Sequence, residues 1–431
     1  YNSYFYPSVS VSWVFSELKP LKEAKWLTFG KIRGGWAKVG NDTDPYNILR
    51  RYANMLDADG YPYQFGSLAM YTLPTTLNNP KLRPETTKSW ELGAELKFIN
   101  NRIGLDFTYY SKNTIDQILP VAISGATGYS FKLMNAGEIS NKGIEAMLTL
   151  VPIRYKDKFE WTLTGNFGKN KNDVVSLTEG IENLQLGVGP FNISVNALVG
   201  QPYGQLMGTD FIYDANGNKV VDQDGRYLKT SDVRALGSVL PDWNLGIGNQ
   251  FKIFGFKLGC LIDIQHGGHF FSTTKMWGTY SGILAASAEG TMREDGVVID
   301  APVAKYDANG DLLYNADGET VQVEDNWNTT VLDARIYCSD FYDGPAAQNV
   351  LDASYVKLRE LTLSYTIPTK YTGPVHNLNI GLYGRNLATW GVAMKGIDPE
   401  SATTSAGNVQ GIEGACLPSL RNFGFNISFN F

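Results

Sequence analysis

Two of the three histidines in this 431-residue chain stand close together and could, by type, bind a metal ion. They are His266 and His269 in the sequence HGGH, and the third histidine, His376, lies far away in the sequence. A zinc site needs a third ligand and a rigid element to hold it. A pair of glycines is instead typical of a turn or bulge at the end of a strand. We therefore predict no metal site at HGGH.

An acidic segment, DANGNKVVDQDG at 214–225, resembles a calcium loop only in part. Asp214, Asn216 and Asn218 have the 1-3-5 spacing of an EF-hand, but the sixth position is lysine and the twelfth is glycine. That loop requires glycine and a bidentate glutamate at these two positions. Asn-Gly is a hairpin-turn signal, and YDANG recurs at 306–310. We expect hairpins and no cofactor; a weak loop-bound calcium ion of another type is the alternative.

No set of residues in the sequence has the spacing of a catalytic site. The chain contains neither GxSxG nor HExxH, and its three cysteines, Cys260, Cys338 and Cys416, are far apart. The odd number and wide spacing of the cysteines argue against a zinc ribbon and against a disulfide framework. We predict that the chain is not an enzyme.

Aromatic side chains are the residues best suited to hold a ligand. They make up 13% of the sequence, and many fall in the long segments 40–87 and 267–352. Their flat faces could stack on sugar rings, beside the Asn, Asp and Arg side chains that bind hydroxyl groups. In the second segment, the residues predicted to contact substrate are Trp277, Tyr280, Trp327, Tyr337, Phe341 and Tyr342. The alternative is that these rings pack the loops against each other or against a covering protein.

The elements that carry these loops are strands with two unlike faces. In the last strand, Phe423, Phe425, Ile427, Phe429 and Phe431 alternate with Asn, Gly and Ser. A period of two places the apolar residues on one face. In a membrane barrel that face meets lipid and the polar face lines the lumen. We interpret these five residues as the lipid-facing side of a closing strand and as a barrel-assembly signal.

The composition excludes further classes of protein. The net charge of −6 argues against nucleic-acid binding, which needs basic patches. No apolar run reaches the roughly 18–20 residues of a membrane helix. We recognise about thirteen candidate strands, including weak ones at 192–199 and 205–213, and their connections are alternately short and long. The long connections lie near 40–87, 115–140, 171–191, 214–241, 267–352 and 389–419.

This alternation predicts an all-β fold, a transmembrane antiparallel β-barrel with its long loops on the outer side. Bacterial single-chain barrels have an even number of strands, and an open sheet edge is not tolerated in lipid. We therefore expect residues 1–431 to form the C-terminal part of a larger barrel whose first strands lie elsewhere. A soluble β-rich binding protein is the alternative, and it would require the apolar faces to pair in a core.

Several segments resemble the SusC/RagA-like TonB-dependent outer-membrane transporters. LRPETTKSWELG at 82–93 resembles a hairpin of that family, and NAGEISNKGIEAML at 135–148 resembles a second family segment. GQPYGQLMG at 200–208, DASYVKLRELTLSYTIP at 352–368 and the final LPSLRNFGFNISFNF follow in the family's order. The resemblance covers nearly the whole chain. It implies a 22-stranded plugged barrel, with the plug and about nine strands absent from this chain.

The resemblance also implies a function and partners. We expect a multi-pass protein of the bacterial outer membrane that imports oligosaccharides, working with a SusD-like surface lipoprotein and the TonB-ExbB-ExbD complex. A dimer of transporter–lipoprotein pairs belongs to the same expectation. The alternatives are a peptide importer of the same family and a passive porin. The acidic loops disfavour an anionic glycan, because like charges repel, and therefore favour a neutral one.

Overall fold

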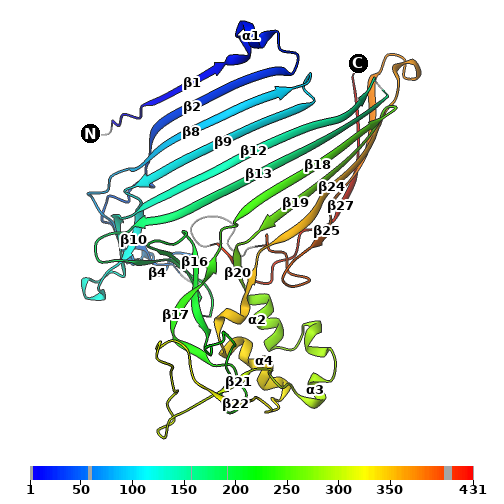
Figure 1. Ribbon diagram of the computed structural model, residues 1–431. Helices are drawn as coiled ribbons and strands as arrows, with labels where there is room; N and C mark the ends of the chain where they lie inside the picture. The colour runs from blue at the N-terminus through cyan, green and yellow to red at the C-terminus, as the bar shows by residue number, and fades with distance from the viewer. Residues whose placement is uncertain (1–2, 57–60, 157, 192, 402–409, 431) are drawn as a thin grey trace. The chain divides into compact units, whose positions relative to one another are not determined.

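The computed structural model describes residues 3–56, 61–156, 158–191, 193–401 and 410–430. The chain divides into two compact units, which Figure 1 shows from blue to red along the sequence. Unit 1 comprises residues 1–148, 168–184 and 198–202, and unit 2 comprises 149–167, 185–197 and 203–431. The boundary passes through the hairpin β12–β13, so that each unit contains part of both strands.

Among the described residues, eleven long strands form one sheet, in the order β1-β2-β8-β9-β12-β13-β18-β19-β24-β25-β27. We call them the wall strands. Their bounds are Ser8–Val14, Leu27–Asn41, Glu85–Phe98, Ile103–Ile115, Glu138–Tyr155, Phe159–Ser176, Trp243–Ile253, Phe256–His266, Tyr355–Thr366, His376–Trp390 and Asn422–Asn430, respectively. The wall strands follow each other in sequence order, as expected when short turns and long loops join antiparallel neighbours.

The wall strands of unit 1 carry paired charges on their polar face. Lys31 on β2 lies 2.7 Å from Glu95 on β8, and Arg33 donates to both carboxylate oxygens of Asp106 on β9. Glu95 thus pairs with the adjacent strand, and Asp106 pairs with Arg33 across the intervening strand β8. Opposite charges placed across strands in this way stabilise a sheet.

The wall strands of unit 2 expose one apolar face. On β27, Phe423, Phe425, Ile427 and Phe429 are all exposed, and the paired Leu382 and Ile380 of β25 share that face. Asn422, Gly424, Asn426 and Ser428 lie on the other face, paired with residues of β25 such as Tyr383 and Asn379. The outward apolar face is what a strand presents to lipid. Phe431, the last residue predicted for this face, lies outside the described residues.

The number of wall strands differs from the predicted thirteen. The weak candidates at 192–199 and 205–213 instead form β15 (Ser194–Leu198) and β16 (Gln205–Phe211) of a separate four-stranded sheet. Val195, Asn196 and Ala197 are successive buried residues, so β15 has no face free to meet lipid. The physical reason for the error is that burial on both sides produces a short apolar run without alternation.

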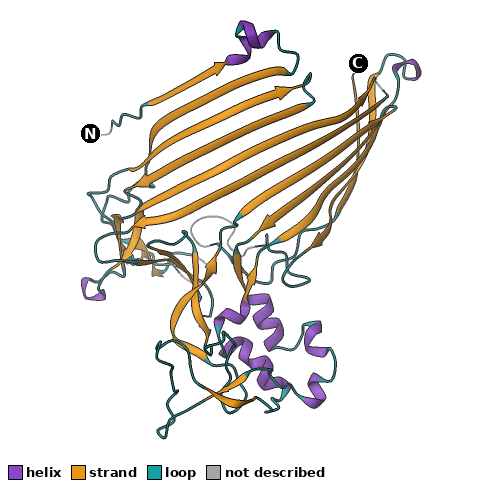
Figure 2. Cartoon of the chain, viewed as in Figure 1, coloured by secondary structure: helices purple, strands orange, loops and turns teal. Residues whose placement is uncertain are grey.

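The loops fold into smaller sheets and short helices (Figure 2). In unit 1, β3 (Ala53–Asn54) pairs with β6 (Tyr71–Thr72), and β4 (Gln64–Phe65) pairs with β5 (Leu68–Ala69). A small sheet in the same unit has the order β10 (Ile118–Ala122), β11 (Phe131–Asn135) and β7 (Thr76–Leu77). The helix α1 spans Lys19–Lys22. Further loop strands are β14 (Asn183–Val188), β17 (Lys229–Ser238), β20 (His269–Ser272), β21 (Pro302–Ala304), β22 (Val323–Trp327), β23 (Val350–Asp352) and β26 (Ile412–Glu413).

The long loops of unit 2 build a structure with its own core, here called the loop body (residues 203–238 and 269–352). Its helices are α2 (Thr273–Tyr280), α3 (Met292–Asp295) and α4 (Ala334–Asp343). Leu206, Phe271 and Met276 form one fully buried cluster, and Val220 and Val321 belong to a second one. The loop body therefore folds as soluble domains do, around buried apolar side chains.

Tandem hairpins account for much of the loop body. An eight-residue pattern occurs as YDANGNKV and VDQDGRYL at 213–228, and as YDANGDLL and YNADGETV at 306–321. Each copy makes a tight turn with a left-handed glycine, such as Gly217 and Gly310. The two pairs join through a parallel bridge from Asp214 to Val321, and a second parallel bridge links Val221 to Val303 of β21, just before the second pair. The predicted hairpins at both YDANG sites are confirmed.

Within the described residues, no helix is long and apolar enough to cross a membrane.

Candidate functional site

An exposed cluster of aromatic rings lies between the two longer helices of the loop body. Trp277 of α2 stacks on Tyr342 of α4, with ring centroids 5.4 Å apart and an interplanar angle of 27°. Tyr280, one helical turn after Trp277, lies 5.4 Å from Trp277 and 5.7 Å from Tyr342. Phe191 meets Trp277 edge-on at 5.1 Å. We call these four rings the aromatic cluster.

The rings remain accessible although they touch each other. Trp277, Tyr280 and Tyr342 are 42%, 43% and 44% exposed, respectively. Three large aromatic side chains held together at that exposure offer flat apolar faces and polar tips to a ligand. Both helices have N-terminal caps that fix where they begin: Ser272 Oγ accepts from the Lys275 amide, and the Asp333 carboxylate accepts from the Arg335 amide.

Three of the six residues predicted to contact substrate thus lie together, and three do not. Tyr337 packs on the buried cluster of Val221 and Leu332, where burial raises its pKa. Phe341 meets Tyr337 edge-on at 5.8 Å. Trp327, at the end of β22, pairs with Pro302 in the sheet β21–β22 and is half-exposed. Tyr337 and Phe341 are therefore parts of the packing inside the loop body.

Phe191 of the aromatic cluster is not among the residues predicted from the sequence to contact substrate. It precedes β15 by a few residues, and it also contacts Tyr342 at 5.6 Å. Phe191 has a positive φ of 60°, which is uncommon for a bulky residue and places its ring on the helices. Leucine, valine and isoleucine residues surround the Pro-Phe pair, and nothing in the sequence tied this stretch to α2 or α4.

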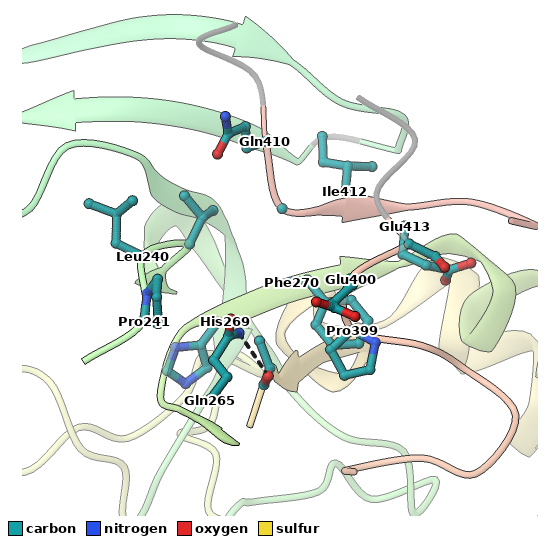
Figure 3. Close-up of a pocket in the computed structure, with 14 residues that line it drawn as sticks. Leu240, Pro241, Gln265, His269, Phe270, Pro399, Glu400, Gln410, Ile412 and Glu413 are labelled. Atoms are coloured by element: carbon teal, nitrogen blue, oxygen red, sulfur yellow. Dashed lines mark hydrogen bonds between the residues drawn. The ribbon is translucent and has the colours of Figure 1, made fainter. Parts of the chain in front are cut away.

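A cavity of about 280 Å³ lies at the junction of the wall strands and loops of unit 2 (Figure 3). Side chains from four segments line it: Leu240 and Pro241 before β18, Gln265 and His269 around the end of β19, Pro399 and Glu400 in the last loop, and Ile412 and Glu413 of β26. About half of the lining is apolar by residue type. The cavity combines apolar walls with a few polar groups, which is usual for small-ligand sites.

A cluster of ion pairs holds the Glu400 wall of this cavity. Lys357 of β24 is only 2% exposed, and its Nζ lies 2.6 Å from Asp398 and 2.5 Å from Glu400. Arg359 pairs with Asp263 at 2.7 Å and also with Glu400. A buried ion pair is stable only when its charges are fully hydrogen-bonded. Here the last loop supplies Asp398 and Glu400, and the wall supplies both cations and Asp263 of β19.

The carboxylates of the last loop stay ionised. Burial alone would raise the pKa of Asp398, but hydrogen bonds from Lys357, Ser419 and the Glu400 amide outweigh burial and lower this pKa to about 2. Burial likewise opposes the hydrogen bonds of Arg359 and Lys357 at Glu400, and the pKa of Glu400 is lowered. The loop is thus held by permanent charges at neutral pH.

HGGH marks the change of direction from β19 to β20. Gly267 and Gly268 have φ values of 76° and 81°, a left-handed pair that few other residues adopt. His266 stacks on Trp243 at 5.1 Å, whereas His269 enters β20. The two imidazoles thus belong to different strands. In the described part of the chain, no three His, Cys, Asp or Glu residues are grouped to hold a metal ion.

The acidic loop at Asp214 uses its carboxylate within the turn. One oxygen accepts from the amides of Asn216 and Asn218 at 2.8 Å, and the other accepts from the Asn218 side chain. Asp307 repeats this pattern with the amides of Asn309 and Asp311. Hydrogen bonds of this kind stabilise Asx turns and explain the conserved spacing within the tandem copies.

The comparisons with known proteins agree on one family. The family model described as "TonB dependent receptor-like, beta-barrel" matches residues 1–387. TonB-dependent receptor P3 of Formosa agariphila is 25% identical over 100% of this chain and 42% of its own length. TonB-dependent receptor SusC of Bacteroides thetaiotaomicron is 23% identical over 99% of this chain and 40% of its own length.

A solved structure, described as that of the RagAB peptide transporter, has a similar fold. It superposes with a TM-score of 0.69 at 17% identity, over 99% of this chain and 43% of that chain. The match extends across both units and includes the large antiparallel sheet. The chain accordingly spans about two fifths of the length of the proteins that it matches.

Proposed function

Because this chain belongs to the TonB dependent receptor-like β-barrel family, an outer-membrane family of transporters rather than enzymes, we propose that it forms part of an active importer of neutral oligosaccharides. Membership of this family confirms three expectations from the sequence: the resemblance to TonB-dependent transporters, the β-barrel fold class and the outer-membrane location. Import activity, cargo and partners are properties of the whole protein, and we propose them here.

The aromatic cluster is the observation that supports a sugar cargo. Trp277, Tyr280 and Tyr342 present three accessible ring faces within one small area of the loop body. The C–H face of a pyranose ring is apolar, so it packs on an aromatic face, while its hydroxyls reach polar groups at the edge. A peptide cargo of the kind named for the RagAB transporter is the second candidate, since the chain resembles that structure in fold.

Binding measurements on the cluster test this proposal. In the full-length transporter, Trp277→Ala removes the central ring and should weaken oligosaccharide binding by roughly fivefold, equivalent to about 1 kcal/mol. Trp327→Ala is the matched control, because Trp327 is similarly exposed but belongs to the sheet β21–β22. Isothermal titration with maltotriose, cellotriose, xylotriose and tetra-alanine compares the cargo classes. Binding of tetra-alanine alone, or equal effects of the two substitutions, would contradict a sugar site at the cluster.

The proposal includes two partners, a SusD-like surface lipoprotein and the TonB-ExbB-ExbD complex. In unit 1, the hairpins β3–β6 and β4–β5 expose several large apolar side chains, among them Phe65, Leu68 and Tyr71. Clustered apolar residues on a polar background are typical of a protein interface. We assign this surface to the lipoprotein. Phe65→Asp should reduce co-purification of the lipoprotein from outer membranes, and Lys81→Asp in the same loop should not; equal recovery in both variants would refute the assignment.

A further inference from the structure

The cavity of Figure 3 has carboxylates in its lining, but their oxygens already have donors. Glu400 accepts from Lys357, Arg359 and the Tyr355 hydroxyl. Glu413 accepts from the hydroxyls of Ser272 and Thr274 at 2.5 and 2.6 Å. Lys357 and Arg359 compensate the charge of Glu400, and two neutral hydroxyls hold the carboxylate of Glu413 in place.

Two further polar side chains in the lining retain hydrogen-bonding capacity. Gln265 donates through Nε2 to the Ala353 carbonyl at 3.0 Å, which leaves Oε1 as an acceptor. His269 Nδ1 is buried without a hydrogen-bond partner among the described residues, and it lies against Gly237. An imidazole can donate and accept through its two nitrogens, so His269 has a capacity that the described residues do not fully use. The lining thus offers the Gln265 acceptor and the His269 imidazole.

The apolar walls and the size of the cavity restrict the ligand further. Leu240 and Pro241 are apolar lining residues from one segment, and Pro399 and Ile412 come from two others (Figure 3). At about 280 Å³ the cavity is just below the ~300–1,000 Å³ of sites for drug-sized ligands, so it has room for one ring and not for a chain.

The cavity is also held open before any ligand arrives. Lys357 and Arg359 fix Glu400, and Asp398 accepts from Ser419 at the other end of the same loop. Gly411, the residue before β26, packs against Val239 on the other side of the cavity. Binding to a preformed site loses less conformational entropy than binding that must order a loop.

We propose that this cavity binds one neutral sugar unit of the cargo, with Gln265 and His269 pairing to its hydroxyls. A sugar hydroxyl is at once donor and acceptor, so neighbouring hydroxyls match both the Gln265 acceptor and the His269 imidazole. The apolar walls receive the C–H face of the same ring. This inference rests on the proposed sugar import and adds a second subsite, built by the wall strands and the last loop, to the aromatic cluster.

The test is a cavity-filling substitution in the full-length transporter. Leu240→Trp places an indole in the cavity, and Leu417→Trp makes the same change at an exposed position of the last loop outside the cavity. His269→Leu removes the imidazole while keeping a side chain of similar bulk. Binding of maltotriose, cellotriose and xylotriose is measured by isothermal titration, and heat-modifiable gel mobility verifies that each barrel is folded.

We expect Leu240→Trp to weaken binding of the bound trisaccharide by about tenfold or more, and His269→Leu by roughly threefold to tenfold, with Leu417→Trp unchanged. Wild-type affinity in a folded Leu240→Trp protein, with sugar still bound, would overturn the cavity assignment and leave sugar import standing. Equal losses in Leu240→Trp and Leu417→Trp would also overturn it. If the wild-type protein binds none of the three sugars, both the proposed cargo and this inference are wrong.

Discussion

The wall strands and the loop body place the same kinds of residue in opposite environments. Leu382 of β25 is 60% exposed on the face that meets lipid, whereas Leu206 of β16 is fully buried. In the wall, hydrogen bonds between the backbones of adjacent strands hold the sheet together, and the apolar side chains face lipid, which is also apolar. In the loop body apolar side chains leave water for a core. One sequence thus follows two sets of folding rules, one for each solvent.

Charged groups also differ in burial from one part of the molecule to another. On the wall of unit 1, Lys31, Arg33 and their carboxylate partners pair across strands and remain partly accessible. At the junction of the wall with the last loop, Lys357 is buried together with Asp398. Accessible pairs contribute little to stability, whereas breaking a buried pair leaves an uncompensated charge. The four predictions that follow test these contrasts.

The largest effect is expected at the buried ion cluster. Lys357→Met leaves Asp398 without its cation and should destabilise the attachment of the last loop by roughly 3–5 kcal/mol. The measurement is the rate of limited proteolysis within residues 391–421. Lys395→Met, an exposed position in the same loop, is the control. If both variants are cleaved at the same rate, the cluster does not hold the loop. Adding Asp398→Asn to Lys357→Met should recover part of the loss.

One substitution made in both regions separates their folding rules. Leu206→Ala opens a cavity in the buried cluster and should cost about 2–5 kcal/mol, while Leu382→Ala on the lipid face should cost well under 1 kcal/mol. Hydrogen exchange of the backbone amides in β16 and in β25 measures both effects locally. Similar losses at the two sites would mean that the wall has an apolar core of its own.

The two faces of the last strand provide a third contrast. Phe425→Arg places a charge on the lipid face and should cost roughly 2–4 kcal/mol, visible as reduced assembly in the outer membrane. Asn426→Arg changes the neighbouring residue on the opposite face and should assemble better. Heat-modifiable mobility of the extracted proteins reports folded barrel. Better assembly of Phe425→Arg than of Asn426→Arg would reverse the assignment of faces.

The smallest expected effect is a pH dependence of the last loop. The pKa of Asp398 falls from its ordinary 3.8 to about 2 on folding, so the folded state binds this proton less tightly than the unfolded state. Its contribution of about 2 kcal/mol is therefore complete above about pH 4 and is lost as the pH falls through about 2. Proteolysis by an acid-active protease should accelerate over that range in the wild-type protein. Asp398→Asn should reduce this pH dependence to the part that Glu400 contributes, because the pKa of Glu400 is also lowered. An unchanged profile would argue against the pairing.

The sequence predicted the wall strands well because their signal is local. The alternation of apolar and polar residues from Phe423 to Phe429 indicates which side of the strand faces lipid, and this pattern does not depend on distant residues. It failed at β15 and β16, where most residues are buried whichever face they lie on. The error added two adjacent strands to the count, so the alternation of short and long connections survived it. A regular pattern of connections is therefore a weaker test of strand number than the burial of each strand.

Composition and alternation by themselves determined a β-barrel membrane fold, the lipid-facing residues and the hairpin turns at Asp214 and Asp307. These depend on side-chain period and on turn chemistry within a few residues. Only the tertiary structure decided which loop aromatics meet, how Lys357 reaches Asp398 and where a cavity forms. The rings of Phe191, Trp277 and Tyr342 come from three separate segments. Their contact depends on how the loop body packs, and that packing minimises exposed apolar surface over the whole unit rather than along any one stretch of sequence.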